Sequence, residues 1–159
     1  MGKKEFKTNV MRVLDQKKIE YKSHSYADTD AISGKEVAEA LGENPDRVFK
    51  TLVTQGNSRN YYVLMIPVLM ELDLKKAAKA ACDKSMELIP VRELLPLTGY
   101  IRGGCSPVGM KKQYPTHLDE TAQLWEEIAV SAGERGHQML LSPEKLAAFI
   151  GGEFVDLIL

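Results

Sequence analysis

The 159-residue sequence has few of the residues that build metal sites and disulfide frameworks. Its two cysteines, Cys82 and Cys105, do not form a CxxC pair, and its three histidines form no HxxxH or HExxH pair. In a reducing compartment, cysteines spaced in this way are typically free thiols. We therefore expect no disulfide, no metal ion and no cofactor.

Long apolar runs and an excess of one charge are also missing. No run approaches the ~20 apolar residues that a helix needs to cross a bilayer, and the N-terminus has no apolar segment of a secretory signal. These absences predict a cytoplasmic protein that does not bind membranes. The formal net charge is −1, so the chain has no overall basic field to hold a long nucleic acid, which argues against DNA as a partner.

What the sequence does contain is an ordinary globular composition, 44% hydrophobic and 27% charged. A chain of this length fits one domain with a sizeable core. It has no internal repeat, linker or low-complexity stretch. The sequence therefore predicts a single domain over residues 1–159.

The hydrophobic pattern predicts more strand than helix and no regular βαβ repeat. Strands are expected over residues 19–26, 48–54, 61–67, 86–89, 116–120, 125–131, 139–141 and 154–159. Helices are expected over residues 6–17, 34–41, 72–82 and 90–95, and after Ser142, with Ser33 and Ser142 as N-caps. Residues 125–131 fit either type, and a strand is favoured because a glycine-bracketed turn and another apolar run follow. The order indicates an α+β (α/β) domain, a mixed barrel-like β-sheet surrounded by helices.

Lys50 is the first residue that the apolar pattern does not explain. Within residues 48–53 (VFKTLV), alternation places Lys50 on a largely apolar face of a central strand, where an unpaired ammonium is costly. One interpretation is an edge lysine whose charged end reaches water. The other is a lysine that points into a pocket to hold an anion or polarise a carbonyl. The pattern alone leaves both open.

A glycine-rich segment, residues 103–109 (GGCSPVG), is the second candidate. Such a segment is either a tight turn or a loop whose free N–H groups bind an oxyanion or a phosphate. Cys105 has no identifiable histidine base and Ser106 has no GxSxG elbow, so we expect no protein nucleophile here. Residues 131–136 (SAGERG) are the third candidate, and their pattern alone predicts a hairpin turn.

These three segments, in this order, resemble the YbaK/EbsC family of tRNA-editing proteins. The segments LKKAAK (residues 74–79) and TGY (residues 98–100) add to the resemblance, which runs from about residue 8 to the C-terminus. It implies a domain like the editing insertion of bacterial prolyl-tRNA synthetases. It also implies deacylation of Cys-tRNA(Pro), with Cys-tRNA(Cys) accepted too. The implied partners are the aminoacylated acceptor end of the tRNA and prolyl-tRNA synthetase.

The resemblance further implies catalysis without a protein nucleophile. The cysteine thiol of the substrate attacks its own ester carbonyl, and the protein supplies positioning and charge. Lys50 is then the catalytic residue, which holds the substrate near the ester or the terminal phosphate. The implied substrate-binding residues are Gly103, Gly104, Ser106 and Pro107 in the loop, Ser131 and Gly133 on the opposite wall, and Tyr26 and Thr51 beside them. Two small basic patches, residues 75, 76 and 79 and residues 111 and 112, are either solvated faces or contacts for tRNA phosphates.

Two other functions fit the same resemblance. The first is an Ala-tRNA(Pro) deacylase, which needs an activated water, and the sequence shows no obvious base for one. The second is a non-catalytic regulator that binds a tRNA or a synthetase. In addition, Ser33 lies near a position where some members of the family carry a bulky aromatic residue.

Overall fold

The structure, a computed structural model, describes residues 6–27, 29, 31 and 34–159. The strands are β1 (Lys22–Ser25), β2 (Phe49–Gly56), β3 (Tyr61–Pro67), β4 (Met86–Leu88), β5 (Thr116–Asp119), β6 (Ile128–Ser131), β7 (His137–Leu141) and β8 (Glu153–Val155). The helices are α1 (Asn9–Gln16), α2 (Gly34–Leu41), α3 (Leu74–Ala80), α4 (Val91–Thr98) and α5 (Pro143–Ile150), with short 3-10 helices η1 (Pro45–Arg47) and η2 (Glu120–Leu124). The predicted N-cap Ser33 lies outside the described residues.

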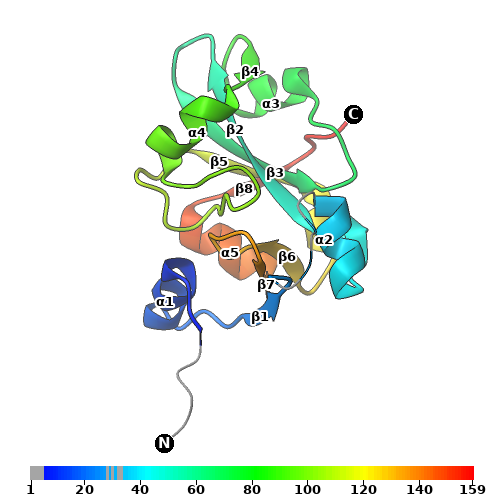
Figure 1. Ribbon diagram of the computed structural model, residues 1–159. Coiled ribbons are helices and arrows are strands. Elements are labelled where there is room, and N and C mark those ends of the chain that lie inside the picture. Colours follow the sequence, from blue (N-terminus) through cyan, green and yellow to red (C-terminus); the bar gives the residue numbers. More distant parts are fainter. Residues whose placement is uncertain (1–5, 28, 30, 32–33) are drawn as a thin grey trace, which may run out of the picture.

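The strands form two sheets (Figure 1). In the larger sheet, of order β4-β2-β3-β5-β8, β2 and β3 form the predicted antiparallel hairpin, whereas β5 pairs in parallel with β3 and β8. The smaller sheet, of order β1-β7-β6, is antiparallel. The two meet where Val48 forms a parallel bridge with Ala129 of β6. The mixed, barrel-like α+β class is confirmed, although the described strands form two joined sheets rather than one closed barrel.

The differences from the predicted elements lie mainly at their ends. Residues 125–131 do contain a strand, β6, but η2 precedes it and was not predicted. The Asp119 side chain accepts a hydrogen bond from Thr121 N and so begins η2, a local signal that the apolar period does not report. The strand predicted over residues 154–159 is too long, because β8 ends at Val155 and Ile158 forms only an isolated bridge with Leu72.

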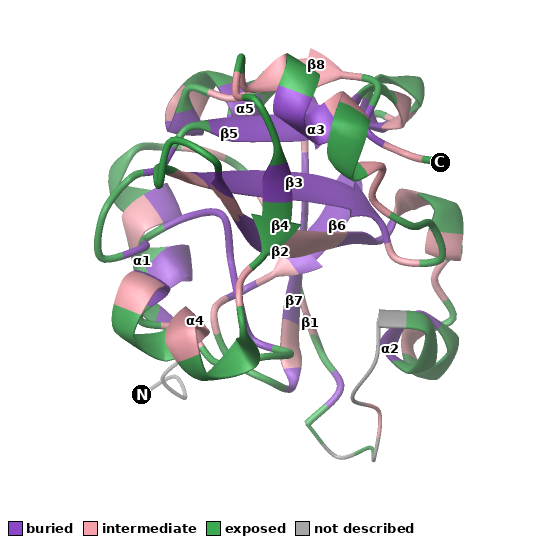
Figure 2. Ribbon diagram, turned by 90° about the horizontal axis from the view of Figure 1, so that it is seen from above, coloured by how far each residue is buried: buried purple, intermediate pink, exposed green. Residues whose placement is uncertain are grey.

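The main core lies between α1, α5 and the sheets. Its fully buried members include Leu14 of α1, Met65 of β3, Leu118 of β5, Met139 of β7 and Leu146 of α5. Burying each such side chain contributes roughly 1.5–3 kcal/mol to folding. Figure 2 shows buried strands at the centre of the molecule and helices that expose their outer faces.

The helix α3 covers another side of the larger sheet. Ala77 and Ala78 of this helix pack in a second cluster with Leu64 and Ile66 of β3. The pattern of small residues on α3 allows the helix backbone to lie close to the strands. This packing fixes β3, and through the hairpin it fixes β2, which carries Lys50.

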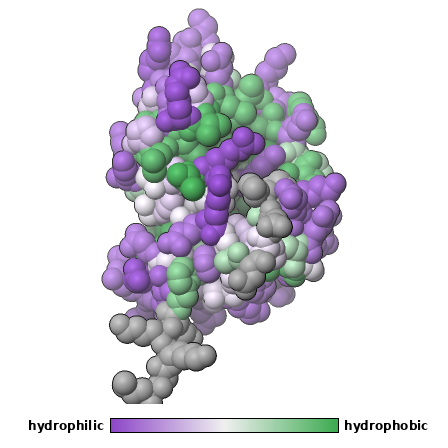
Figure 3. Space-filling model, viewed as in Figure 1, coloured by the Kyte–Doolittle hydropathy of each residue, from purple (hydrophilic) through white to green (hydrophobic). Residues whose placement is uncertain are grey.

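Apolar side chains also remain exposed around α4, where Figure 3 shows them gathered on the upper part of the molecule. They are Leu88, Val91, Leu95 and Ile101, each about half exposed. Surfaces of this kind often contact other proteins. Within the described ranges, no helix is both long enough and apolar enough to span a bilayer.

Candidate functional site

A small cavity of about 110 Å³ lies where the two sheets meet, and we call it the lysine pocket. Its walls come from α2, from the starts of β2 and β7, from the end of β6 and from the glycine-rich loop. The lining residues are Tyr26, Val37, Val48, Phe49, Lys50, Thr51, Val68, Gly103, Cys105, Ser131, His137 and Gln138. The structure thus brings together the predicted Tyr26, Lys50, Thr51, Gly103 and Ser131.

Lys50 is a partly buried cation in the wall of this pocket. It lies opposite Ile66 in the β2–β3 hairpin, in a stretch of β2 that β4 does not reach. Burial lowers the pKa of Lys50 from its ordinary value, and the negative charge of Glu71 opposes that shift. Its ammonium makes no hydrogen bond or ion pair with the described residues, so its donors are available to a ligand.

Two buried polar atoms in the same walls also lack hydrogen-bond partners among the described residues. They are the hydroxyl oxygen of Thr51 and the amide oxygen of Gln138. Leaving a buried polar atom unpaired costs about 1–3 kcal/mol, so native proteins seldom do it without a reason. Gln138 and Lys50 both line the lysine pocket, whereas the Thr51 side chain lies on the face of β2 opposite to that of Lys50. Gln138, only 5% exposed, was not among the predicted site residues.

The glycine-rich loop packs against the 131–136 segment. Gly103 has φ +87°, and a Cβ on Gly104 would lie 3.2 Å from the backbone nitrogen of Arg135. The Tyr100 hydroxyl donates a hydrogen bond to the Val108 carbonyl and so anchors the far end of the loop. Two backbone segments can approach this closely because the loop residues have no side chains there.

The remaining predicted residues are not among those that line the pocket. Ser106 is fully buried, and its hydroxyl oxygen accepts a hydrogen bond from Val108 N at 3.3 Å. Pro107 is buried beside it, and Gly104 is buried under the 131–136 segment. Gly133 has φ +97°, and its N–H donates to the Ser131 hydroxyl at 3.1 Å. Their contacts shape the loop and the turn around the lining.

Cys105 lines the pocket but is not activated. Burial raises the pKa of the Cys105 thiol to about 12. A thiol with that pKa stays protonated at neutral pH, and only the thiolate is strongly nucleophilic. Cys105 is therefore a poor nucleophile in this environment.

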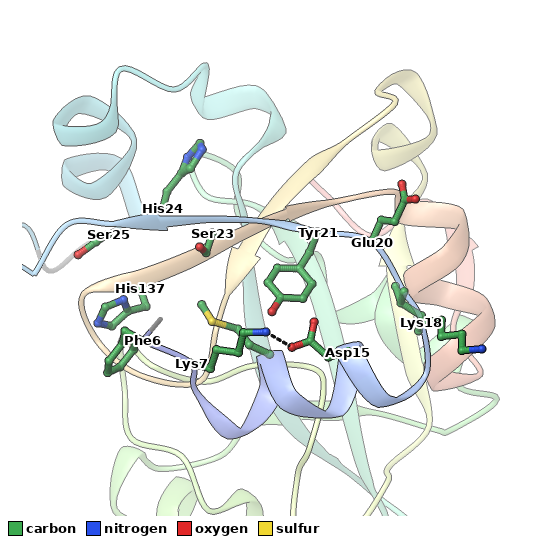
Figure 4. A pocket seen from close by; sticks show the side chains of 12 residues that line it. Phe6, Lys7, Asp15, Lys18, Glu20, Tyr21, Ser23, His24, Ser25 and His137 are labelled. Carbon is green, nitrogen blue, oxygen red and sulfur yellow. Dashed lines mark hydrogen bonds and ion pairs between the residues drawn. The ribbon is translucent and has the colours of Figure 1, made fainter. Parts of the chain in front are cut away.

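A larger groove of about 900 Å³ lies between α1 and β1 (Figure 4), and we call it the N-terminal groove. Its walls are Phe6, Lys7, Met11, Asp15, Lys18, Ile19, Glu20, Tyr21, Ser23, His24, Ser25 and His137. His137 lines both cavities. Its ring stacks on Phe6, with centroids 4.2 Å apart and planes at 18°. The sequence prediction missed His137 because its neighbours come from strands distant in the sequence.

The basic patches differ in how free their lysines are. Lys75 and Lys79 line a cavity of about 430 Å³ with Lys84. In contrast, Lys76 donates to the Ile158 carbonyl at 2.6 Å and pairs with Asp156 at 2.9 Å. Across the part of the chain that the structure describes, no group of three or more His, Cys, Asp or Glu residues is placed to hold a metal ion.

Comparison with known proteins gives consistent matches. The family model for the aminoacyl-tRNA editing domain matches residues 28–149. EbsC of Enterococcus faecalis, provisionally named a Cys-tRNA(Pro)/Cys-tRNA(Cys) deacylase, is 49% identical over 152 residues, which are 95% of this chain and 93% of that protein. A solved structure provisionally described as a trans-editing enzyme for prolyl-tRNA synthetase has a TM-score of 0.82 and 25% identity, covering 98% of this chain and 99% of that one. The hypothetical protein APE2540 has the same fold, with a TM-score of 0.86 at 21% identity, over 94% of this chain and 99% of that one.

Proposed function

The chain belongs to the family of aminoacyl-tRNA editing domains, and from this premise we propose that it is a trans-editing deacylase that removes cysteine from mischarged Cys-tRNA(Pro). Cys-tRNA(Cys) is the second substrate in this proposal, as the name of the Enterococcus faecalis relative states for that protein. The observation that supports the proposal most is the lysine pocket. It combines an ammonium without an ion-pair partner among the described residues with the unpaired buried oxygen of Gln138, in a cavity suited to a small amino acid.

The proposed reaction uses the thiol of the substrate. That sulfur attacks the carbonyl carbon of its own ester, the bond from carbon to the ribose oxygen breaks, and the thiol proton goes to the departing ribose hydroxyl. Water then opens the resulting thiolactone. The protein needs only to hold the thiol and the ester in a reactive arrangement and to stabilise the charge that develops on the carbonyl oxygen.

Lys50 is the residue proposed to stabilise that charge. An ammonium in a partly desolvated wall interacts more strongly with an oxyanion than it does in water. The Gln138 amide oxygen accepts hydrogen bonds, which suits the α-ammonium of the amino acid. Gly103 lets the loop backbone approach the aminoacyl group, and Ser131 lines the facing wall.

The pocket gives less support to an Ala-tRNA(Pro) deacylase. Alanine has no thiol, so a water molecule must be activated by a base. Among the lining residues that the structure describes there is no carboxylate, and the one imidazole, that of His137, stacks on Phe6. A non-catalytic role as a tRNA-binding or synthetase-binding regulator is the other alternative. A deacylation assay distinguishes this role from catalysis.

We propose prolyl-tRNA synthetase as a partner and the cytoplasm as the location, where tRNAs are charged. The solved relative described as a trans-editing enzyme for that synthetase supports this partner. The net charge of −1 supports it too, because the chain has little electrostatic attraction of its own for a whole tRNA.

The experiment is a deacylation assay with Cys-tRNA(Pro), Cys-tRNA(Cys), Ala-tRNA(Pro) and correctly charged Pro-tRNA(Pro). We expect both cysteinyl substrates to be cleaved and the alanyl and prolyl substrates to be spared. Preferential cleavage of Ala-tRNA(Pro) would show that the protein is an Ala-tRNA(Pro) deacylase instead. Binding of tRNA without cleavage of any substrate would show that it is a non-catalytic regulator.

A further inference from the structure

Lys75, Lys79 and Lys84 line the cavity of about 430 Å³ beside α3 and the loop that joins it to β4, and we call it the basic cavity. All three residues are exposed. In the described part of the chain, none of their ammoniums has an ion-pair partner. Their charges are therefore available to an external anion.

The three charges repel one another in the absence of a ligand. Lys75 and Lys79 are four residues apart on α3, a spacing at which two cations lie on the same side of a helix and destabilise it. Among the lining residues that the structure describes, the one carboxylate is that of Asp83. Positive charge is thus in excess, and an anion that enters the basic cavity relieves the repulsion.

The Asp83 carboxylate is already bound by the protein itself. Its Oδ2 accepts hydrogen bonds from the hydroxyls of Ser58 and Tyr62. Its Oδ1 accepts from the backbone N–H of Ser58 at 3.3 Å and from that of Lys84 at 2.7 Å. A Cβ on Gly56 would lie 2.0 Å from Oδ2, so the carboxylate packs directly on the β2–β3 hairpin. Asp83 is therefore an anchor of the loop and pairs with none of the three lysines.

Backbone hydrogen bonds hold the same loop on two sides. The N–H of Asp83 donates to the Ala78 carbonyl of α3 at 2.9 Å, and the N–H of Asn57 donates to the Ser85 carbonyl at 3.0 Å. The backbone of Lys84 is thus fixed relative to α3, which carries the other two lysines. A site that is arranged in advance loses less conformational entropy when a ligand binds.

The basic cavity and Lys50 lie on the same face of the larger sheet. Lys50 and Leu52 are two residues apart on β2 and so point to one face, and Leu52 packs with Ala77 of α3. β4 pairs with residues 54–56 at the far end of β2, and Figure 1 shows α3 and β4 together at the top of the molecule. The distance along β2 from Lys50 to Gly56 is about 20 Å, which corresponds to roughly six stacked nucleotides.

The chemistry of the basic cavity fits the backbone of a nucleic acid better than its bases. Among its described lining residues, none is aromatic, so it offers no ring on which a base could stack. Lysine ammoniums are flexible point charges that bind phosphate groups without reading sequence. Because the net charge of the chain is −1, attraction for RNA has to come from local excesses of positive charge such as this one.

We propose that the basic cavity binds backbone phosphates of the tRNA, upstream of the aminoacylated end, through Lys75, Lys79 and Lys84. This inference rests on the proposed function for the identity of the RNA. It separates these lysines from Lys76, whose ammonium pairs with Asp156 at 2.9 Å.

The test measures the affinity of the full chain for uncharged tRNA(Pro) over a range of salt concentrations. Each phosphate that a lysine neutralises contributes roughly 0.7–0.9 to the slope of log K against log salt concentration. K75Q/K79Q/K84Q is therefore expected to weaken binding and to reduce the slope by roughly 2–3. K75R/K79R/K84R keeps the three charges and is expected to keep most of the slope, because guanidinium groups also bind phosphate.

The matched control is K17Q/K18Q/K145Q, which removes three exposed positive charges outside the basic cavity. It is expected to leave the slope close to that of the wild type. Because all six lysines are exposed, both glutamine variants are expected to melt close to the wild-type temperature. Steady-state deacylation of Cys-tRNA(Pro) provides the second readout, with a higher KM and a smaller effect on kcat expected in K75Q/K79Q/K84Q.

An unchanged slope in K75Q/K79Q/K84Q, or an equal drop in the control variant, would overturn the inference. Loss of binding to prolyl-tRNA synthetase with an unchanged tRNA slope would overturn it too, because the basic cavity would then bind a protein. If the slope changes as expected but the wild type cleaves no cysteinyl-tRNA, the proposed function fails instead. The two failures are distinguishable because the binding assay uses uncharged tRNA.

Discussion

Gly103 and Arg135 bring the two glycine-rich segments of the site into contact. The Nε of Arg135 donates to the Arg102 carbonyl at 2.8 Å, and a Cβ built on Gly103 would lie 2.9 Å from that Nε. Gly103 also has φ +87°, a backbone conformation that costs a side chain about 1–2 kcal/mol. Gly103 therefore links the shape of the loop to the wall of the lysine pocket.

G103A is expected to lower the free energy of unfolding by about 1–2 kcal/mol and to reduce deacylation by more than the stability loss explains. The control is G151A, where φ is +68° and no atom lies within 4 Å of the added Cβ. That variant carries a similar backbone strain far from the lining. Thermal melts and initial rates of both variants check the prediction. Equal activity in the two would show that the loop does not shape the site.

The fold was largely predictable because its elements have clear apolar periods and turn residues. The β2–β3 hairpin is one example, since its two apolar strands flank a cluster of turn residues at 56–60. The missed elements, η1 and η2, depend on the side-chain caps of Asn44 and Asp119. Such caps are single local hydrogen bonds that leave no trace in hydrophobic periodicity.

The site was predictable only in part. Lys50 could be predicted as a site residue because its ammonium interrupts an apolar strand, and Lys50 does line a pocket. Gln138 and His137 enter that pocket only through the pairing of β7 with β1 and β6, which joins segments far apart in the sequence. A polar Gln138 within an otherwise apolar strand end was the available signal. The periodicity of the sequence does not report which side chains line the cavity, because that depends on tertiary packing.

Replacing Gln138 tests whether its unpaired oxygen serves the substrate. Q138M keeps the size and removes the amide, so the buried oxygen no longer lacks a partner. We expect unchanged or increased stability together with a lower kcat/KM for Cys-tRNA(Pro), because leaving a buried acceptor unpaired costs folding energy. Chemical denaturation and steady-state kinetics measure the two effects. A destabilised protein with normal kinetics would make Gln138 a structural residue.

Cys105 is expected to be dispensable for the chemistry. C105A removes a buried thiol whose pKa is raised to about 12, and the reacting sulfur in our account belongs to the substrate. Deacylation by C105A is therefore expected to stay within a few-fold of the wild type. A loss of ~100-fold or more, with a normal thermal melt, would restore a protein nucleophile.

The pH dependence of stability tests the environment of Lys50. Because burial lowers the pKa of Lys50 in the folded protein, the charged form is less favourable there than in the unfolded chain. The cost is fully present below the folded pKa and disappears as pH rises toward the unfolded value of 10.5. K50M is thus expected to be at least as stable as the wild type at neutral pH, and the difference is expected to shrink at alkaline pH. Urea denaturation of both proteins from pH 7 to pH 10.5 measures it, and a difference that grows with pH would contradict the assignment.

The deacylation rate of K50A tests the central claim most directly, measured on Cys-tRNA(Pro) beside a thermal melt of the same preparation. Removing one electrostatic group from a catalytic site typically costs ~10²–10³ in rate, whereas removing a partly buried charge need not destabilise the fold. We expect K50A to fold normally and to lose at least ~100-fold in rate. We expect K50R to recover only part of it, because a planar guanidinium does not occupy the place of a compact ammonium. The exposed K145A is the matched control and is expected to keep full activity. A well-folded K50A protein with near-wild-type activity would contradict the account.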